Sequence, residues 1–105
     1  MLRIFNIKQG DAFSFTITFK NLQEDLTTFT MGVKEDYNDE RMLVTKSLGN
    51  GITKIQTGKY RVDFTPAETQ ALPPMLYVYD LRMTLGSTVF TPLYGYLNMQ
   101  ETVFE

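Results

Sequence analysis

Strict alternation of apolar and polar residues is the feature that most constrains the fold of this chain. In the stretch FSFTITF, residues 13–19, four apolar side chains alternate with Ser and Thr. A period of two places successive side chains on opposite faces of a β-strand, so one face of this segment is expected to be buried. A shift of one residue would expose all four apolar groups, and we therefore expect the register of this strand to be firmly fixed.

Turn residues divide the chain into eight such segments. The expected strands are 2–8, 12–20, 26–34, 41–46, 52–56, 59–64, 75–85 and 88–99. The 8 Phe and 6 Tyr, together with many Thr, Val and Ile, suit pleated, half-buried surfaces. At 105 residues the chain is predicted to form one domain over 1–105, with a flexible C-terminal tail at 100–105.

One segment breaks the alternation and predicts a short helix. In TPAETQAL, Thr65 stands where an N-cap residue is needed, Pro66 at the first helical position and Glu68 three residues after the cap. This is a capping box followed by a proline whose missing N–H costs nothing at that position. We expect one or two helical turns that end before Pro73.

These elements predict an all-β fold, an immunoglobulin-like antiparallel β-sandwich of seven or eight strands with one short helix between the sixth and seventh strands. The apolar face of residues 13–19 is expected to pack across the sandwich against Tyr79, Leu81 and Met83. Tyr77 follows the helical crossover and is expected to bond nearby backbone through its hydroxyl, as in a tyrosine corner.

The composition argues against several classes of chemistry. The chain has no Cys and no His, which excludes disulfides, thiolate or imidazole metal sites and His-based catalytic triads. The net charge is -2, the basic residues are scattered, and no segment has the roughly 20 apolar residues of a membrane span or the pattern of a secretory leader. We expect neither nucleic acid nor a membrane as a partner.

The acidic residues give no pattern typical of an active site. Most lie in turns, and Asp80, which lies on a strand beside Arg82, is explained by a solvated sheet face. The loop 36–40 resembles the start of a calcium-binding loop, but Arg41 replaces its turn glycine and Ser47 its bidentate glutamate. We therefore expect no catalytic residue, no cofactor and no metal site, and the protein is predicted not to be an enzyme.

The last strand is unusual because both of its faces are apolar. Alternation places Val89, Leu93, Leu97 and Met99 on one side and Phe90, Tyr94 and Tyr96 on the other. Pro92 marks an edge or a bulge, and Gly95 a second irregularity.

Two interpretations of this strand stay open. It is either a central strand covered on both faces, or Phe90, Tyr94 and Tyr96 are exposed and pack against another subunit. In the second case Val103 and Phe104 of the tail are expected to extend a sheet edge of the neighbour.

The order of these segments resembles that of small bacteriophage tail and baseplate proteins, in particular the N-terminal domain of phage baseplate upper proteins. The resemblance rests on QGD.FSFTITFKN, DLTTFTMGVK, GKYRVDFTPAETQAL and YVYDLRMTLGS, although DLTT lacks the turn glycine of that family's DLTG. It implies a virion building block, assembled in the host cytoplasm as a homo-oligomer with other virion structural proteins, with no catalytic residues to transfer.

The resemblance also makes Gln9-Gly10-Asp11 a structural turn. In such a turn the glycine adopts a backbone conformation that other residues resist, and Asp11 bonds the surrounding backbone. The alternative function is a carbohydrate-binding or adhesion module that presents an exposed ladder of Tyr94 and Tyr96.

Overall fold

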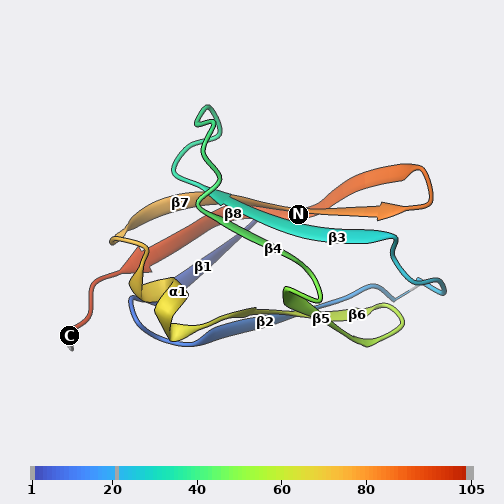
Figure 1. Cartoon of the computed structure of the whole chain (residues 1–105), viewed down its shortest axis with the longest axis horizontal. Helices are drawn as coiled ribbons and strands as arrows, with labels where there is room; N and C mark the ends of the chain where they lie inside the picture. Colours follow the sequence, from blue (N-terminus) through green and yellow to red (C-terminus); the bar gives the residue numbers. More distant parts are fainter. Residues whose placement is uncertain (1, 21, 104–105) are drawn as a thin grey trace.

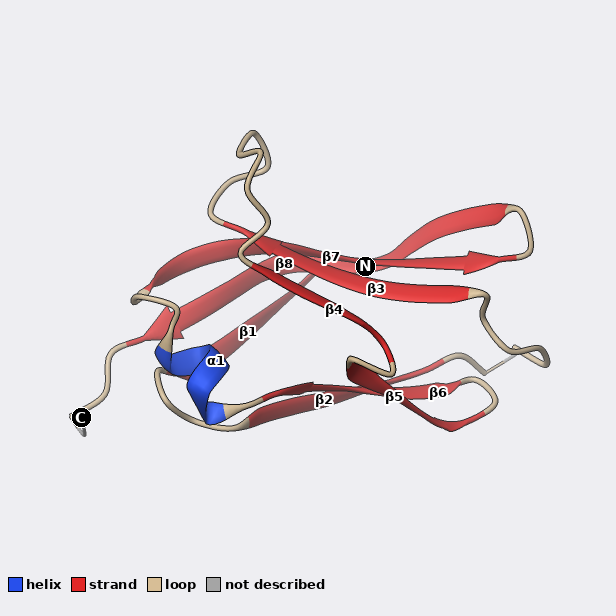
Figure 2. Ribbon diagram, in the orientation of Figure 1, coloured by secondary structure: helices blue, strands red, loops and turns tan. Residues whose placement is uncertain are grey.

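The alternating segments form strands close to the predicted positions. The computed structural model describes residues 2–20 and 22–103. The strands are β1 (Leu2–Lys8), β2 (Phe13–Thr18), β3 (Thr28–Lys34), β4 (Val44–Leu48), β5 (Gly51–Gln56), β6 (Lys59–Phe64), β7 (Met75–Leu85) and β8 (Thr88–Gln100), and helix α1 (Pro66–Gln70) lies between β6 and β7 (Figures 1 and 2). The prediction of an all-β fold with one short helix is confirmed, and the strand bounds differ most from the expected ones in β4, which the sequence predicts at 41–46.

All eight strands belong to one mixed sheet that is nearly closed into a barrel. Their hydrogen-bonded order is β1-β8-β7-β3-β4-β5-β6-β2. The sheet folds over itself, so that β2, β5 and β6 lie opposite β3, β7 and β8 (Figure 1). The two edge strands approach each other through aromatic rings, because Phe5 of β1 stacks on Phe15 of β2 with ring centroids 4.6 Å apart.

The prediction of a purely antiparallel arrangement is wrong at two strand pairs. Strand β1 runs parallel to β8, and both strands run toward the end of the molecule where α1 lies (Figure 1). Strands β4 and β5 are also parallel, over only two residue pairs on either side of the short Gly49–Asn50 link. Parallel strands normally need a long crossover, so this short pairing marks a corner at which the chain passes from one side of the barrel to the other.

One apolar cluster fills the interior. Tyr79, Leu81 and Met83 of β7 belong to it together with Phe15, and the other apolar residues of 13–19 pack against it partly buried. The two predicted strand faces therefore share one core. The ring of Phe5 lies between them, 5.7 Å from that of Tyr79 by ring centroids.

Two local predictions are confirmed around α1. The Thr65 hydroxyl accepts a hydrogen bond from the Glu68 N–H at 3.2 Å, and the Glu68 carboxylate accepts one from the Thr65 N–H at 2.9 Å, which completes the capping box. The Tyr77 hydroxyl donates to the Pro73 carbonyl at 2.6 Å, the contact expected of a tyrosine corner.

Candidate functional site

A β-bulge at Pro92 decides which side chains of β8 face outward. Leu93 pairs with Leu81 of β7, whereas the next pair on the other side of the bulge is Phe90 with Met83. Two residues of β8, one of them Pro92, therefore lie opposite a single residue of β7. This bulge agrees with the predicted irregularity at Pro92, because proline lacks the N–H that a regular ladder would use.

The bulge reverses the alternation, so the predicted grouping of side chains on β8 is wrong. Paired residues share a face, and Phe90 therefore lies on the core face with Met83, near the turn that joins β7 to β8. Val89 pairs with Thr84, the neighbour of Met83 on β7, and therefore lies on the face opposite to that of Leu93. Tyr94 and Tyr96 lie on the outer face, and Phe90, Tyr94 and Tyr96 keep 38%, 41% and 36% of their surface exposed.

Val103 of the tail lies apart from these aromatic side chains, beside Lys8 and Asp11. Val103 is 91% exposed, and Phe104 lies outside the described residues. The chain just before them is held at β1, where the Lys8 ammonium donates to the Glu101 carbonyl at 3.1 Å.

Exposed apolar side chains gather on the outer face of β1, β8 and β7. We call this set the outer-face patch. Its members are Leu2, Ile4, Leu76, Tyr94 and Tyr96, each at least 36% exposed. The parallel register places Leu2 opposite Tyr94 and Ile4 opposite Tyr96, so the patch runs continuously across two strands. Sequence reasoning missed Leu2 and Ile4, because β1 has apolar residues on both faces and its pattern does not show which face is buried.

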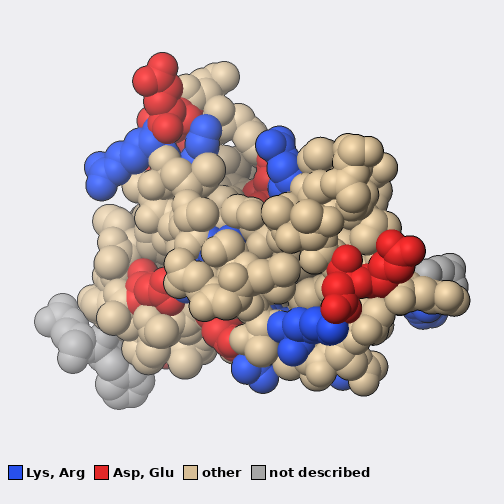
Figure 3. All heavy atoms as spheres, turned by 45° about the vertical axis from the view of Figure 1, so that its right-hand side comes forward, with Lys and Arg blue, Asp and Glu red and all other residues tan. Residues whose placement is uncertain are grey.

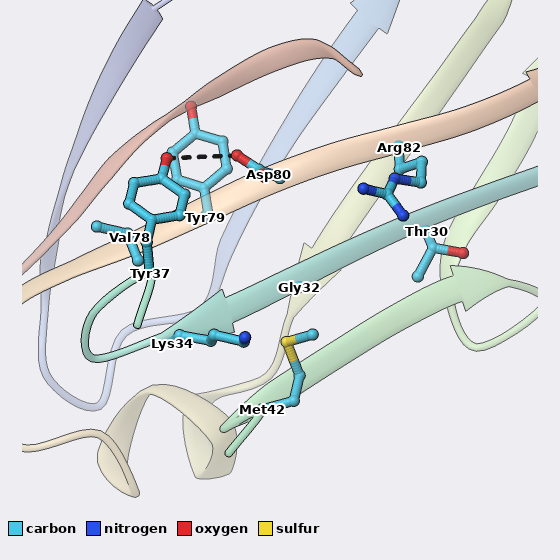
Figure 4. A pocket seen from close by; sticks show the side chains of 9 residues that line it. All are labelled: Thr30, Gly32, Lys34, Tyr37, Met42, Val78, Tyr79, Asp80 and Arg82. Carbon is cyan, nitrogen blue, oxygen red and sulfur yellow. Dashed lines mark hydrogen bonds between the residues drawn. The ribbon is translucent and has the colours of Figure 1, made fainter. Parts of the chain in front are cut away.

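Beside the patch, on β3 and β7, the outer face carries an open hollow of about 500 Å³ (Figure 4). Gly32 of β3 pairs with Asp80 of β7 and leaves the space above it free of side-chain atoms from β3. Met42 reaches over this glycine, and a Cβ at position 32 would lie 2.6 Å from its sulfur. A side chain at this position would therefore displace Met42 and fill part of the hollow.

Tyr37 forms one wall of the hollow. Its loop is tightened by a hydrogen bond from the Asn38 N–H to the Asp36 carboxylate at 3.1 Å, and the Tyr37 hydroxyl donates to Asp80 Oδ1 at 3.3 Å. Partial burial, and then the charge and the hydrogen bond of Asp80, raise the pKa of Tyr37. The sequence signal that could have pointed to this hollow is one aromatic residue, Tyr37, among the acidic residues of the loop 35–40.

The charged groups that line the hollow are one carboxylate and two cations. Asp80 is the single carboxylate among its lining residues, so no pair of acids of the kind that glycosidases use is present there. Lys34 and Arg82 flank Asp80 on the paired strands, and neither forms an ion pair within the described ranges. Across residues 2–20 and 22–103, no cluster of acidic side chains could hold a metal ion.

Charge and helix content add two further observations. Acidic and basic side chains intermingle in Figure 3, and no patch of a single sign covers the face shown there. In the described part of the chain, no helix is long and apolar enough to cross a membrane.

The chain was compared with known proteins. No protein-family model matches the sequence, and a search of curated proteins finds no similar one.

Proposed function

We propose that this chain is a non-enzymatic structural component of a bacteriophage virion, a tail or baseplate building block that assembles in the host cytoplasm. The observation that carries the proposal is the outer-face patch. Contiguous exposed apolar surface is typical of sites that a protein partner covers, and Tyr and Met are enriched at the centres of such interfaces. The order of folding signals that resembles phage tail and baseplate proteins supports this class of particle.

In this proposal the partner docks on a sheet face. Tyr94 and Tyr96 are rigid amphipathic side chains, and Leu2 and Ile4 extend their apolar surface onto β1. A stable interface buries about 800 Å² on each partner, so the contact extends beyond the patch itself. Copies of the chain and other virion proteins are the proposed partners, and closed symmetric oligomers are the usual outcome of self-association.

We also propose that the nearly closed barrel is a variant of the immunoglobulin-like sandwich. Two features support this relation: strands lie on two opposed sides in Figure 1, and Tyr77 bonds the backbone at the crossover as a tyrosine corner does. In this variant, the β4–β5 corner links the two sides into one sheet.

Sedimentation velocity of the pure chain over a range of concentrations tests the assembly proposal. We expect concentration-dependent association that Ile4→Asp and Tyr96→Asp abolish, because each places a charge within an apolar contact. Ile55→Asp is the matched control, since Ile55 is 44% exposed on β5, across the barrel from the patch. A wild-type chain that stays monomeric throughout, or association unchanged in both patch variants, would contradict self-association through this face.

The predicted roles of Phe90, Val103 and Phe104 are tested separately. Val103→Asp and Phe104→Asp variants in the same assay measure the contribution of the tail, and Phe90→Asp measures that of the hairpin end. The virion context is tested by the genes beside this one. A tail-morphogenesis cluster supports the proposal, and a polysaccharide-degradation operon contradicts it.

A further inference from the structure

The hollow on β3 and β7 combines an apolar wall with a few convergent polar groups. Val78 lies on its floor and is only 8% exposed although it is on the outer face of the sheet, and Tyr37 and Met42 form the walls. Its volume of about 500 Å³ falls in the range of about 300–1,000 Å³ that small-ligand sites occupy. Such a site has the dimensions to hold a ligand of one or two rings.

The polar groups in the centre of the hollow select a ligand that carries hydroxyl groups. Asp80 accepts a hydrogen bond from Tyr37 through Oδ1, and no described group donates to its Oδ2. An ionised carboxylate only accepts hydrogen bonds, so the free oxygen calls for a donor from the ligand. Thr30 adds a hydroxyl that both donates and accepts, on the strand opposite Arg82.

Two cations at the rim can pair with an anionic group of a ligand. Lys34 and Arg82 contribute two positive charges and Asp80 one negative charge, so the formal charge of the lining is +1. Neither cation has an ion-pair partner in the described part of the chain. The guanidinium fork of an exposed arginine matches the two oxygens of a carboxylate.

We propose that this hollow is a binding site for a short acidic saccharide of the uronic-acid type. The sugar carboxylate pairs with Arg82 or Lys34, its hydroxyls donate to Asp80, and its apolar ring face lies against Tyr37. An acidic peptide fits less well, because the backbone groups of β3 and β7 under the hollow are already paired with each other and offer its amides no partners. The site uses none of the outer-face patch residues and does not depend on the assembly proposal.

NMR titration of the isotope-labelled full chain with digalacturonic acid tests the site. We expect saturable shifts of the Gly32, Asp80 and Arg82 amide signals, and weaker binding at higher salt, since exposed charges are screened. Arg82→Met should weaken the affinity about tenfold, because a charge-assisted hydrogen bond is lost. Lys20→Met, which removes an exposed charge beyond the end of β2, should leave the affinity unchanged.

Two further ligands and one further variant decide the class of ligand. A neutral digalactoside should bind at least several-fold more weakly, and the N-acetylated Glu-Glu dipeptide should not saturate. Equal binding of the dipeptide would reassign the site to acidic peptides, and the absence of saturable shifts with digalacturonic acid would overturn the proposal. If Arg82→Met fails to fold, Tyr37→Ala takes its place, because Tyr37 is an exposed loop residue. An affinity for digalacturonic acid that Tyr37→Ala leaves unchanged would also count against the site.

Discussion

Thr69 of α1 is fully buried and joins the helix to the turn between β1 and β2. Its hydroxyl accepts a hydrogen bond from the Gly10 N–H at 3.1 Å and donates to the Asp11 carbonyl at 2.8 Å. Asp11 therefore bonds through its main chain. The prediction that Asp11 bonds the surrounding backbone is met by its main chain, and within the described ranges its carboxylate accepts no hydrogen bond.

The other two residues of this turn also have a structural role. The side-chain amide of Gln9 donates to the Gln70 carbonyl at 3.0 Å and to the Leu72 carbonyl at 3.2 Å. It thereby supplies donors to carbonyls at the end of the helix, which lack partners within the helix. Gly10 has a φ of 88°, a backbone conformation that favours glycine. The QGD sequence is thus a clamp on α1, in agreement with its prediction as a structural turn.

Replacing Thr69 with Val tests this clamp. The two side chains have nearly the same shape, but Val leaves the Gly10 N–H and the Asp11 carbonyl without their partner. We expect the free energy of unfolding to fall by about 1–3 kcal/mol, measured by urea denaturation. Thr53→Val on the exposed face of β5 is the control, and equal effects of the two changes would contradict the role of the clamp.

At the scale of elements, β1 depends on a glycine in β8. Gly95 has a φ of 150°, and a Cβ at this position would overlap the Arg3 carbonyl of β1. The same carbonyl accepts a hydrogen bond from the Tyr79 hydroxyl at 2.9 Å, and burial is the main cause that raises the pKa of Tyr79 to about 12. The predicted irregularity at Gly95 thus lies in its backbone conformation, because the β7–β8 register is unbroken there.

Gly95→Ala and Gly86→Ala separate the steric overlap from backbone strain. Both glycines have positive φ, but nothing lies within 4 Å of a Cβ at Gly86. We expect a loss of about 1 kcal/mol for Gly86→Ala and about 3 kcal/mol for Gly95→Ala. Hydrogen exchange should show faster opening of β1 amides in the Gly95 variant alone, and slow exchange of β1 in both would contradict the overlap.

The sequence patterns located the strands and the helix better than they located the contacts between distant segments. Alternation and capping residues are local, so they identified β6, β7 and α1 with its Thr65–Glu68 box. The side of the sheet that Phe90 faces depends on where the bulge falls, and Pro92 marks the bulge without fixing how many residues it spans. The hollow depends on Gly32 lying opposite Asp80, a pairing between distant segments that no local pattern encodes.

At the scale of the whole molecule, an ion pair between a buried lysine and a half-buried glutamate ties the β4–β5 corner to helix α1. Lys46 of β4 is 5% exposed, pairs with the Glu68 carboxylate, and lies 4.9 Å from the centroid of the Phe64 ring. Burial acts to raise the pKa of Glu68, but hydrogen bonds from Lys46 and Thr65 outweigh it and lower the pKa below 4.5. The closed packing of the molecule therefore depends on pH.

The pH dependence of stability follows from the sign of this shift. The ion pair contributes fully above pH 4.5, the unshifted value for Glu68, and its contribution is lost as the pH falls through the lower pKa of the folded state. Glu68→Gln should therefore cost about 1–3 kcal/mol at pH 7 and give a flatter decline below pH 4.5. Urea denaturation of Glu68→Gln and of the exposed control Glu24→Gln at pH 7, 5 and 3 checks this. If the free energy of unfolding falls equally with pH in both variants, the role of the ion pair is contradicted.

The pairing of β1 with β8 has a consequence for how the protein is made. Leu2 lies opposite Tyr94, so β1 leaves the ribosome well before the strand with which it pairs. Translation proceeds at about 5–20 residues per second, which leaves the apolar side chains of β1 uncovered for several seconds. The barrel can thus close only after β8 has been synthesised, and we expect nascent chains that stall before β8 to bind chaperones.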